Sequence, residues 1–110
     1  MNSSFPANDI AKLIKAKWNF LTKNSKNPKE EVAVEVATGF GLMRVARLEA
    51  VSPEFLELGV FEDETQIMGQ IIIAHVSQCE FKFSRVPIPA KQEQPKEFIV
   101  GLFSEGHKQA

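Results

Sequence analysis

The chain has 110 residues, of which 44% are hydrophobic and 25% are charged, and its formal net charge is −1. These values lie close to the averages for globular domains and argue against a disordered chain, a collagen-like fibre or a membrane-spanning protein. At this length we expect one domain that buries a core without disulfides or structural zinc.

The charge is distributed unevenly. Residues 1–29 contain six lysines and one acidic residue, Asp9, for a net charge of +5, so residues 30–110 sum to −6. The basic segment predicts a face for an anionic partner, a helix that complements the acidic body of its own or a neighbouring subunit, or simply a solvated lysine face. The acidic remainder disfavours strong nucleic-acid binding by the whole body.

The single cysteine, Cys79, excludes an intrachain disulfide and favours a reducing compartment. The first ten residues lack a basic cluster followed by an apolar run, and the longest apolar stretch, around residues 71–76, is too short to cross a bilayer. We therefore expect a cytoplasmic protein with no membrane partner.

Helical spacing begins at Asn8. Asn8 or Asp9 is expected to cap the helix, with Pro6 just outside it, and Lys23 complements the negative end of its dipole. The expected apolar stripe, which packs on the rest of the molecule, consists of Ile10, Leu13, Ile14, Trp18 and Leu21.

From Glu31 the spacing alternates, as is typical of strands. Residues 32–36 alternate in valine, the turn TGFG follows, and residues 42–51 resume an extended pattern, so we expect a hairpin. Residues 55–61, 67–76 and 78–83 are three further extended runs. Five short strands joined by brief turns pair antiparallel, and we expect a small, strongly bent barrel.

Residues 86–110 are expected to extend a domain formed by residues 1–85. Pro87, Pro89 and Pro95 disfavour a regular internal strand before Glu97. The apolar hexamer Phe98–Phe103 predicts one more strand, laid against an exposed edge or a neighbouring subunit.

Three segments carry a family resemblance: Val32-x-Val34-x-Val36-x-x-Gly39, residues 48–58 (LEAVSPEFLEL) and residues 73–77 (IAHVS). In this order, after a helix, they resemble the Sm and Sm-like family, which includes bacterial Hfq. The first resembles the opening of the first Sm motif, the second resembles the family's second and third strands, and the third resembles the Tyr-Lys-His-Ala-Ile-Ser segment of Hfq. The resemblance covers about residues 8–84.

The chain also departs from the family pattern. The first hairpin is longer, an extra residue sits near Pro53, and Ala74 stands where Hfq has a lysine. The Asn and Arg-Gly of eukaryotic and archaeal Sm proteins are absent from the corresponding loops. These differences leave the number of subunits open, and an OB-like or SH3-like barrel is the alternative fold.

The resemblance implies an Sm-like ring that binds single-stranded RNA on the face carrying the helix. Phe55 corresponds to the residue on which Hfq stacks a base, and His75 lies at the point that resembles its uridine site. Glu54 brings negative charge where the family commonly places an amide. The residues expected to neutralise phosphate are Lys12, Lys15 and Lys17.

Self-association follows from the strands as well. Five short strands leave two open edges, and apolar residues such as Ile71 and Ile73 invite pairing with another copy. Identical subunits joined head to tail close into a cyclic homo-oligomer, for which the resemblance implies about five to seven subunits.

Each candidate residue also has a purely structural explanation, because a lone strand histidine or phenylalanine is often packed and helix lysines often only solvate a face. The alternative function is therefore an oligomeric scaffold or protein-interaction module that binds no nucleic acid. We do not expect an enzyme, a cofactor or a metal site, since the sequence has no glycine-rich phosphate loop, no recognised nucleophile setting and only two histidines, His75 and His107.

Overall fold

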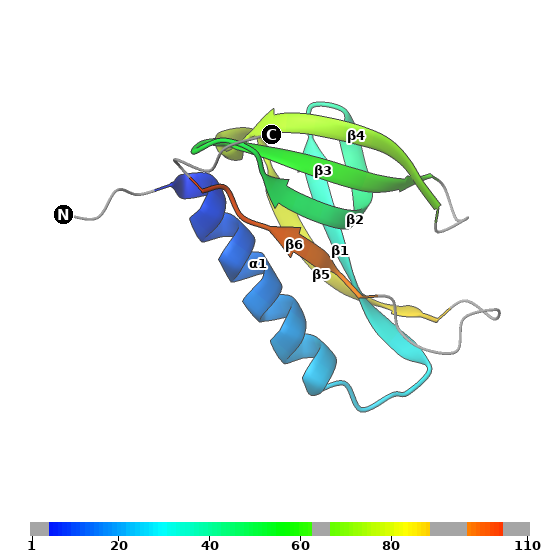
Figure 1. Cartoon of the computed structure of the whole chain (residues 1–110). Coiled ribbons are helices and arrows are strands. Elements are labelled where there is room, and N and C mark those ends of the chain that lie inside the picture. Colours follow the sequence, from blue (N-terminus) through cyan, green and yellow to red (C-terminus); the bar gives the residue numbers. More distant parts are fainter. Residues whose placement is uncertain (1–4, 63–66, 89–96, 105–110) are drawn as a thin grey trace.

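A single helix lies beside a bent β-sheet in the computed structural model, which describes residues 5–62, 67–88 and 97–104 (Figure 1). The elements in chain order are α1 (Pro6–Lys23), β1 (Glu30–Thr38), β2 (Gly41–Ala50), β3 (Phe55–Glu62), β4 (Ile67–His75), the 3₁₀ turn η1 (Val76–Gln78), β5 (Glu80–Pro87) and β6 (Ile99–Gly101). The prediction of a mainly β chain with an N-terminal helix is confirmed. Residues 63–66 and His107 lie outside the described residues.

The start of α1 differs from the prediction. The helix begins at Pro6, because a proline in the first turn has no amide hydrogen to leave unpaired. Phe5 is the N-cap and no side chain caps the helix, so the predicted cap by Asn8 or Asp9 is wrong. Asn8 instead binds the backbone of Phe103.

The buried stripe of α1 is narrower than the predicted one. Leu13 is 65% exposed, so its assignment to the apolar stripe is wrong. The small side chains of Ala7 and Ala11 let the first turns of α1 approach the sheet closely. The sequence prediction considered only large apolar residues and did not indicate this. The buried residues are Ala7, Ala11, Ile14 and Trp18, and the helix contacts β1, β2 and β6.

The five main strands form one antiparallel sheet in the order β4-β3-β2-β1-β5. Consecutive hairpins give the order β4-β3-β2-β1, because each of these turns is too short for anything but a neighbouring antiparallel strand. The chain then passes through η1 to the opposite edge, where β5 pairs with β1. The sheet bends but does not close in the described residues, where β4 and β5 remain its two edges. The predicted barrel is therefore an open, bent sheet with α1 beside it.

A bulge at Ala46 divides β2 between two neighbours. Before it, β1 pairs with β2 from Val34↔Val45 to Thr38↔Gly41. The register with β3 shifts between Val45 and Arg47, as in a β-bulge, which bends a strand. Beyond the bulge β1 no longer pairs with β2, and β6 takes its place as a parallel neighbour of residues 47–49.

The predicted extra strand therefore exists, but its predicted position is wrong. It pairs inside the same chain with β2, between that strand and α1, and not on either sheet edge (Figure 1).

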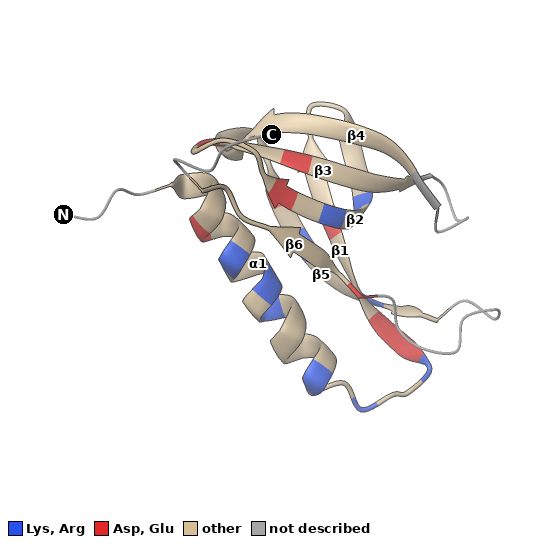
Figure 2. Ribbon diagram, in the orientation of Figure 1, with Lys and Arg blue, Asp and Glu red and all other residues tan. Residues whose placement is uncertain are grey.

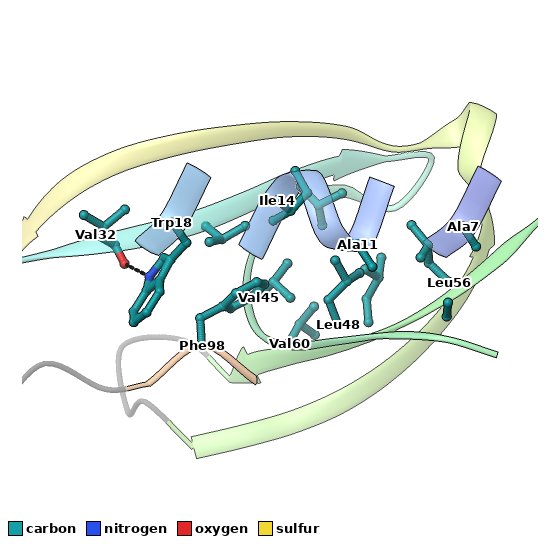
Figure 3. Packing of buried hydrophobic residues seen from close by; sticks show 14 residues of the cluster. Ala7, Ala11, Ile14, Trp18, Val32, Val45, Leu48, Leu56, Val60 and Phe98 are labelled. Atoms are coloured by element: carbon teal, nitrogen blue, oxygen red, sulfur yellow. Dashed lines mark hydrogen bonds between the residues drawn. The ribbon is translucent and has the colours of Figure 1, made fainter. Parts of the chain in front are cut away.

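The core lies between α1 and the inner face of the sheet (Figure 3). Alternating residues of β1, β2 and β3 supply its centre, including Val36, Leu48 and Leu58, all fully buried. Trp18 and Phe98 pack at one end with ring centroids 6.2 Å apart, and the Trp18 indole N–H donates to the Val32 carbonyl at 3.1 Å. The single tryptophan is buried, as predicted.

Candidate nucleic-acid interface

Phe55 and His75 lie side by side where two neighbouring strands meet at one end of the sheet. Phe55 begins β3, His75 ends β4, and the two residues are paired in the ladder. Their rings make an edge-to-face contact, with centroids 5.2 Å apart and planes at 89°. The resemblance places these two residues in one site, and the structure brings them together.

The loop before Phe55 is fixed from three sides. The Ser52 hydroxyl accepts from the Phe55 amide at 3.1 Å, and the Pro53 carbonyl accepts from the Ala7 amide at 2.9 Å. The Glu54 carbonyl accepts from the Val76 amide at 3.0 Å. These hydrogen bonds attach the loop to the first turn of α1 and to η1. The position of Phe55 is therefore fixed by contacts with a helix and a 3₁₀ turn.

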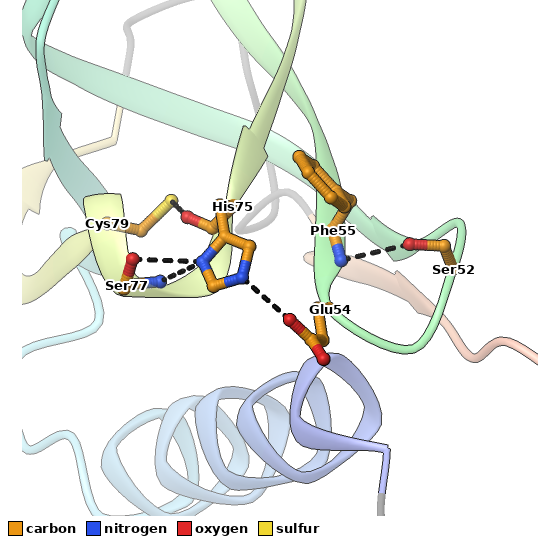
Figure 4. A network of polar contacts seen from close by, with 6 residues as sticks. All are labelled: Ser52, Glu54, Phe55, His75, Ser77 and Cys79. Carbon is orange, nitrogen blue, oxygen red and sulfur yellow. Dashed lines mark hydrogen bonds and ion pairs between the residues drawn. The ribbon is translucent and has the colours of Figure 1, made fainter.

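The hydrogen bonds of His75 fix its tautomer. Its Nδ1 accepts from the Ser77 backbone N–H at 3.1 Å and lies 2.9 Å from the Ser77 hydroxyl oxygen. Because a backbone amide can only donate, Nδ1 carries no proton in this arrangement, and the proton of the neutral ring is on Nε2. Nε2 lies 2.9 Å from the Glu54 carboxylate and donates to it (Figure 4).

Glu54 thus occupies the Nε2 nitrogen of the His75 ring. Its side chain is 60% exposed, so water competes for the carboxylate and the contact is weak. Sequence reasoning noted the charge of Glu54 but did not predict its bond to His75. Only the geometry of the 52–54 loop places these residues together.

Phe55 is available to a ligand. Its side chain is 42% exposed, whereas that of the next residue, Leu56, is completely buried in the core. Successive side chains of a strand point to opposite faces, so Phe55 lies on the face of the sheet that points away from the core. Ile71 and Ile73 on β4 are also exposed, by 56% and 59%.

The three candidate lysines belong to α1, along which basic residues are distributed (Figure 2), whereas Phe55 belongs to β3. The first turn of α1 touches the 52–54 loop, and the lysines begin about 8 Å further along the axis and end at about 15 Å. Lys12 and Lys17 are exposed. The Lys15 ammonium donates to the Phe98 carbonyl and lies 4.7 Å from the centroid of the Trp18 ring. Lys15 therefore joins α1 to the segment that contains Phe98.

A charged pair on β2 and β3 was missed by sequence reasoning. The Arg47 guanidinium and the Glu57 carboxylate lie 2.7 Å apart. Arg47 is paired with Gly59 and Glu57 with Ile73, so both residues share the outward face of the sheet with Phe55. Their spacing along two separate strands gives no local motif, which is why the sequence did not indicate them.

A cavity of about 30 Å³ lies in the fork between β1 and β2, with Trp18, Val34, Val45 and Phe98 among its lining residues. One water molecule needs about 10–15 Å³ of such space, so the cavity has room for about two or three waters. In the described ranges, no group of three or more His, Cys, Asp or Glu residues could hold a metal ion. Over the same residues, no helix is long and apolar enough to cross a membrane.

Comparisons of the chain with family models, curated proteins and solved structures found no match.

Proposed function

We propose that this chain is an Sm-like protein of the cytoplasm that forms a ring and binds single-stranded RNA, with Phe55 as the base-stacking residue. The observation that carries the proposal is a half-exposed Phe55 ring braced edge-to-face by His75 at a fixed strand end. Stacking suits single-stranded RNA because every base has a π-face, and each stacked base contributes roughly 1–3 kcal/mol.

His75 orients the stacking platform and offers its ring edge to a base. The bond of His75 Nε2 to Glu54 is solvent-exposed, so a ligand can replace it at small cost. An acceptor atom of the base would then accept the hydrogen bond from Nε2–H that the Glu54 carboxylate accepts in the structure. Glu54 opposes binding in a second way, since its negative charge repels phosphate.

The lysines of α1 supply the electrostatic part of the affinity. Lys12 and Lys17 are exposed on the helix, and a ring would repeat them once per subunit. Repetition matters because each single patch is modest, and several weak contacts on one strand of RNA raise the overall affinity through effective concentration.

The first test is a titration of fluorescent uridine-rich and adenine-rich oligonucleotides at about 50 mM salt, where electrostatic attraction is little screened. We expect Phe55→Ala to weaken binding by about 5-fold to 100-fold, the loss of one stacking contact. Phe40→Ala is the matched control, because Phe40 is 79% exposed but lies at the tip of the β1–β2 hairpin. Equal effects of the two substitutions would contradict the proposal.

Glu54→Gln gives a test with the opposite sign. It removes the repulsive charge and weakens the bond that holds His75, so affinity for RNA should rise about 2-fold to 10-fold. Glu80→Gln is the control for net charge, because Glu80 is exposed at the start of β5. Removing Lys12 or Lys17 should instead reduce the dependence of affinity on salt, by about 0.7 in the logarithmic slope for each lost phosphate contact.

A scaffold without nucleic acid is the second candidate function. Two observations favour it: the Glu54 carboxylate already occupies His75, and the exposed Ile71 and Ile73 side chains suit contact with protein. If no oligonucleotide binds at about 50 mM salt while the chain remains oligomeric, the RNA proposal fails and the scaffold remains.

A further inference from the structure

The second half of β2 and α1 flank β6 on its two sides, and we call the space that β6 fills between them the groove. Residues 47–49 of β2 pair with β3 on one side. On their other side β1 is no longer a partner, because its pairing with β2 ends at Val45, before the bulge at Ala46. The backbone groups on that side would be unpaired without β6, which lies in the groove as a short parallel strand (Figure 1).

The segment Phe98–Phe103 is held at its two ends by different contacts. At the first end, Phe98 is 4% exposed against Trp18, and its carbonyl accepts from the Lys15 ammonium. At the other end, the Asn8 side-chain amide donates to the Phe103 carbonyl at 2.6 Å, and its oxygen accepts from the Phe103 amide at 2.7 Å. Asn8 therefore pairs with the backbone of Phe103 as a neighbouring strand would.

The groove also selects the residues between these ends. A Cβ atom at Gly101 would lie 3.0 Å from the Glu49 Cγ, so a larger residue there fits only if the Glu49 side chain moves, and glycine is favoured. Ile99 and Leu102 are 56% and 49% exposed, so their identity matters little. Backbone pairing with side-chain pockets at alternate positions is how proteins bind extended peptides by strand addition.

We infer that this groove is a peptide-docking site for the pattern Phe-x-Val-Gly-x-Phe, and that a second copy of this chain can supply the segment in place of the chain's own. The contacts described above all come from the segment itself. Nine residues join it to Ile88, and ten Cα steps span at most about 35 Å, roughly the diameter of a small domain. The exchange would preserve every contact, which is the condition for strand swapping between identical chains.

In a single wild-type chain the tethered segment has an effective concentration in the millimolar range and keeps out dilute competitors. The test therefore uses full-length chains whose own segment is weakened. Phe98→Ala removes the anchor and Gly101→Val introduces a clash, while Trp18, Lys15 and Asn8 remain in the groove. The probe is a fluorescent peptide with the sequence of residues 97–104.

Both weakened chains should bind this peptide at least tenfold more tightly than the wild-type chain does. A peptide carrying Leu102→Ala should bind like the unmodified one, and a peptide carrying Gly101→Val should bind at least tenfold more weakly. If a weakened chain is unfolded alone, the peptide should restore the buried emission of Trp18 and raise the melting temperature. The docking site is refuted if the unmodified peptide neither binds nor stabilises either chain, or if the Gly101→Val peptide binds equally well.

The second copy is tested by complementation. Full-length Asn8→Ala keeps its segment but has a weakened groove, whereas full-length Phe98→Ala keeps its groove. Mixing the two should give association that exceeds that of either variant alone, measured by sedimentation. No gain on mixing would overturn exchange between copies. RNA takes no part in these measurements, so they stand or fall independently of the proposed function.

Discussion

Trp18 joins the helix to the sheet through both its ring and its nitrogen. Its side chain is 8% exposed, and the indole N–H satisfies the Val32 carbonyl on the side of β1 that β2 leaves unpaired. A buried carbonyl without a donor costs about 1–3 kcal/mol, so Trp18→Phe should lower the free energy of unfolding by that amount. Trp18→Ala should cost about 3–5 kcal/mol, because it also removes the ring.

Urea unfolding measures both changes, followed by circular dichroism because Trp18 is the only tryptophan. Phe20→Ala on the same helix is the control, since Phe20 is 59% exposed. A wild-type emission spectrum characteristic of water-exposed indole would contradict the burial of Trp18.

Cys79 is half-buried beside the end of β4, and burial raises the pKa of its thiol above the usual value of 9.0. The folded chain should therefore hold less thiolate than the unfolded chain at a given pH and react more slowly with iodoacetamide. The unfolded thiol ionises first, so the stability that this group contributes is present below about pH 9 and is lost as pH rises further. Alkylation rates in buffer and in urea measure the first effect, and equal rates would exclude it.

The tight β1–β2 hairpin depends on one glycine. Gly41 has a φ of +111°, a conformation that side chains rarely adopt, whereas Gly39 has open space around its Cβ position. Gly41→Ala should therefore lower the free energy of unfolding by about 1–2 kcal/mol. Gly39→Ala should change it by less than about 0.5 kcal/mol, as is usual for a surface substitution. Equal losses in chemical denaturation would show that the backbone angle is not the cause.

The main elements could be predicted because their signals are local. Alternating valines predicted β1, and helical spacing from Asn8 to Lys23 predicted most of α1. The position of β6 could not be predicted, since its apolar run suits any unpaired backbone and only the bulge at Ala46 creates the place it fills. The exposure of Leu13 depends likewise on how close Ala7 and Ala11 bring the helix to the sheet.

The candidate site was predictable in part. The proximity of Phe55 and His75 follows from hairpin register, which the family resemblance implied. The bond between His75 and Glu54 depends on the loop that the Ser52 side chain and the Ala7 amide hold, and no local pattern encodes it. The contact of Lys15 could not be predicted either, because its acceptor, the Phe98 carbonyl, belongs to a segment that is distant in the sequence.

At the scale of the whole molecule, β4 and β5 leave two antiparallel edges without a neighbour in the described residues. A strand edge is a template for another chain, and a closed ring of copies would pair every edge. We expect light scattering at micromolar concentration to give a mass of about five to seven chains.

Ile73→Lys should lower that mass, because a lysine on an edge strand opposes strand pairing. Leu13→Lys is the matched control, since Leu13 is exposed to a similar degree on α1. A wild-type mass equal to one chain would remove the physical basis of the ring.

The position of β6 also bears on the order in which the molecule can be completed. Lys15 and Phe98 are 83 residues apart in sequence, and Asn8 and Phe103 are 95 apart. During synthesis the helix and the five main strands are made before the segment that pairs with β2. A nascent chain therefore exposes Trp18 and one side of β2 until residues 98–103 have been made, and these long-range contacts are slow to form by topology.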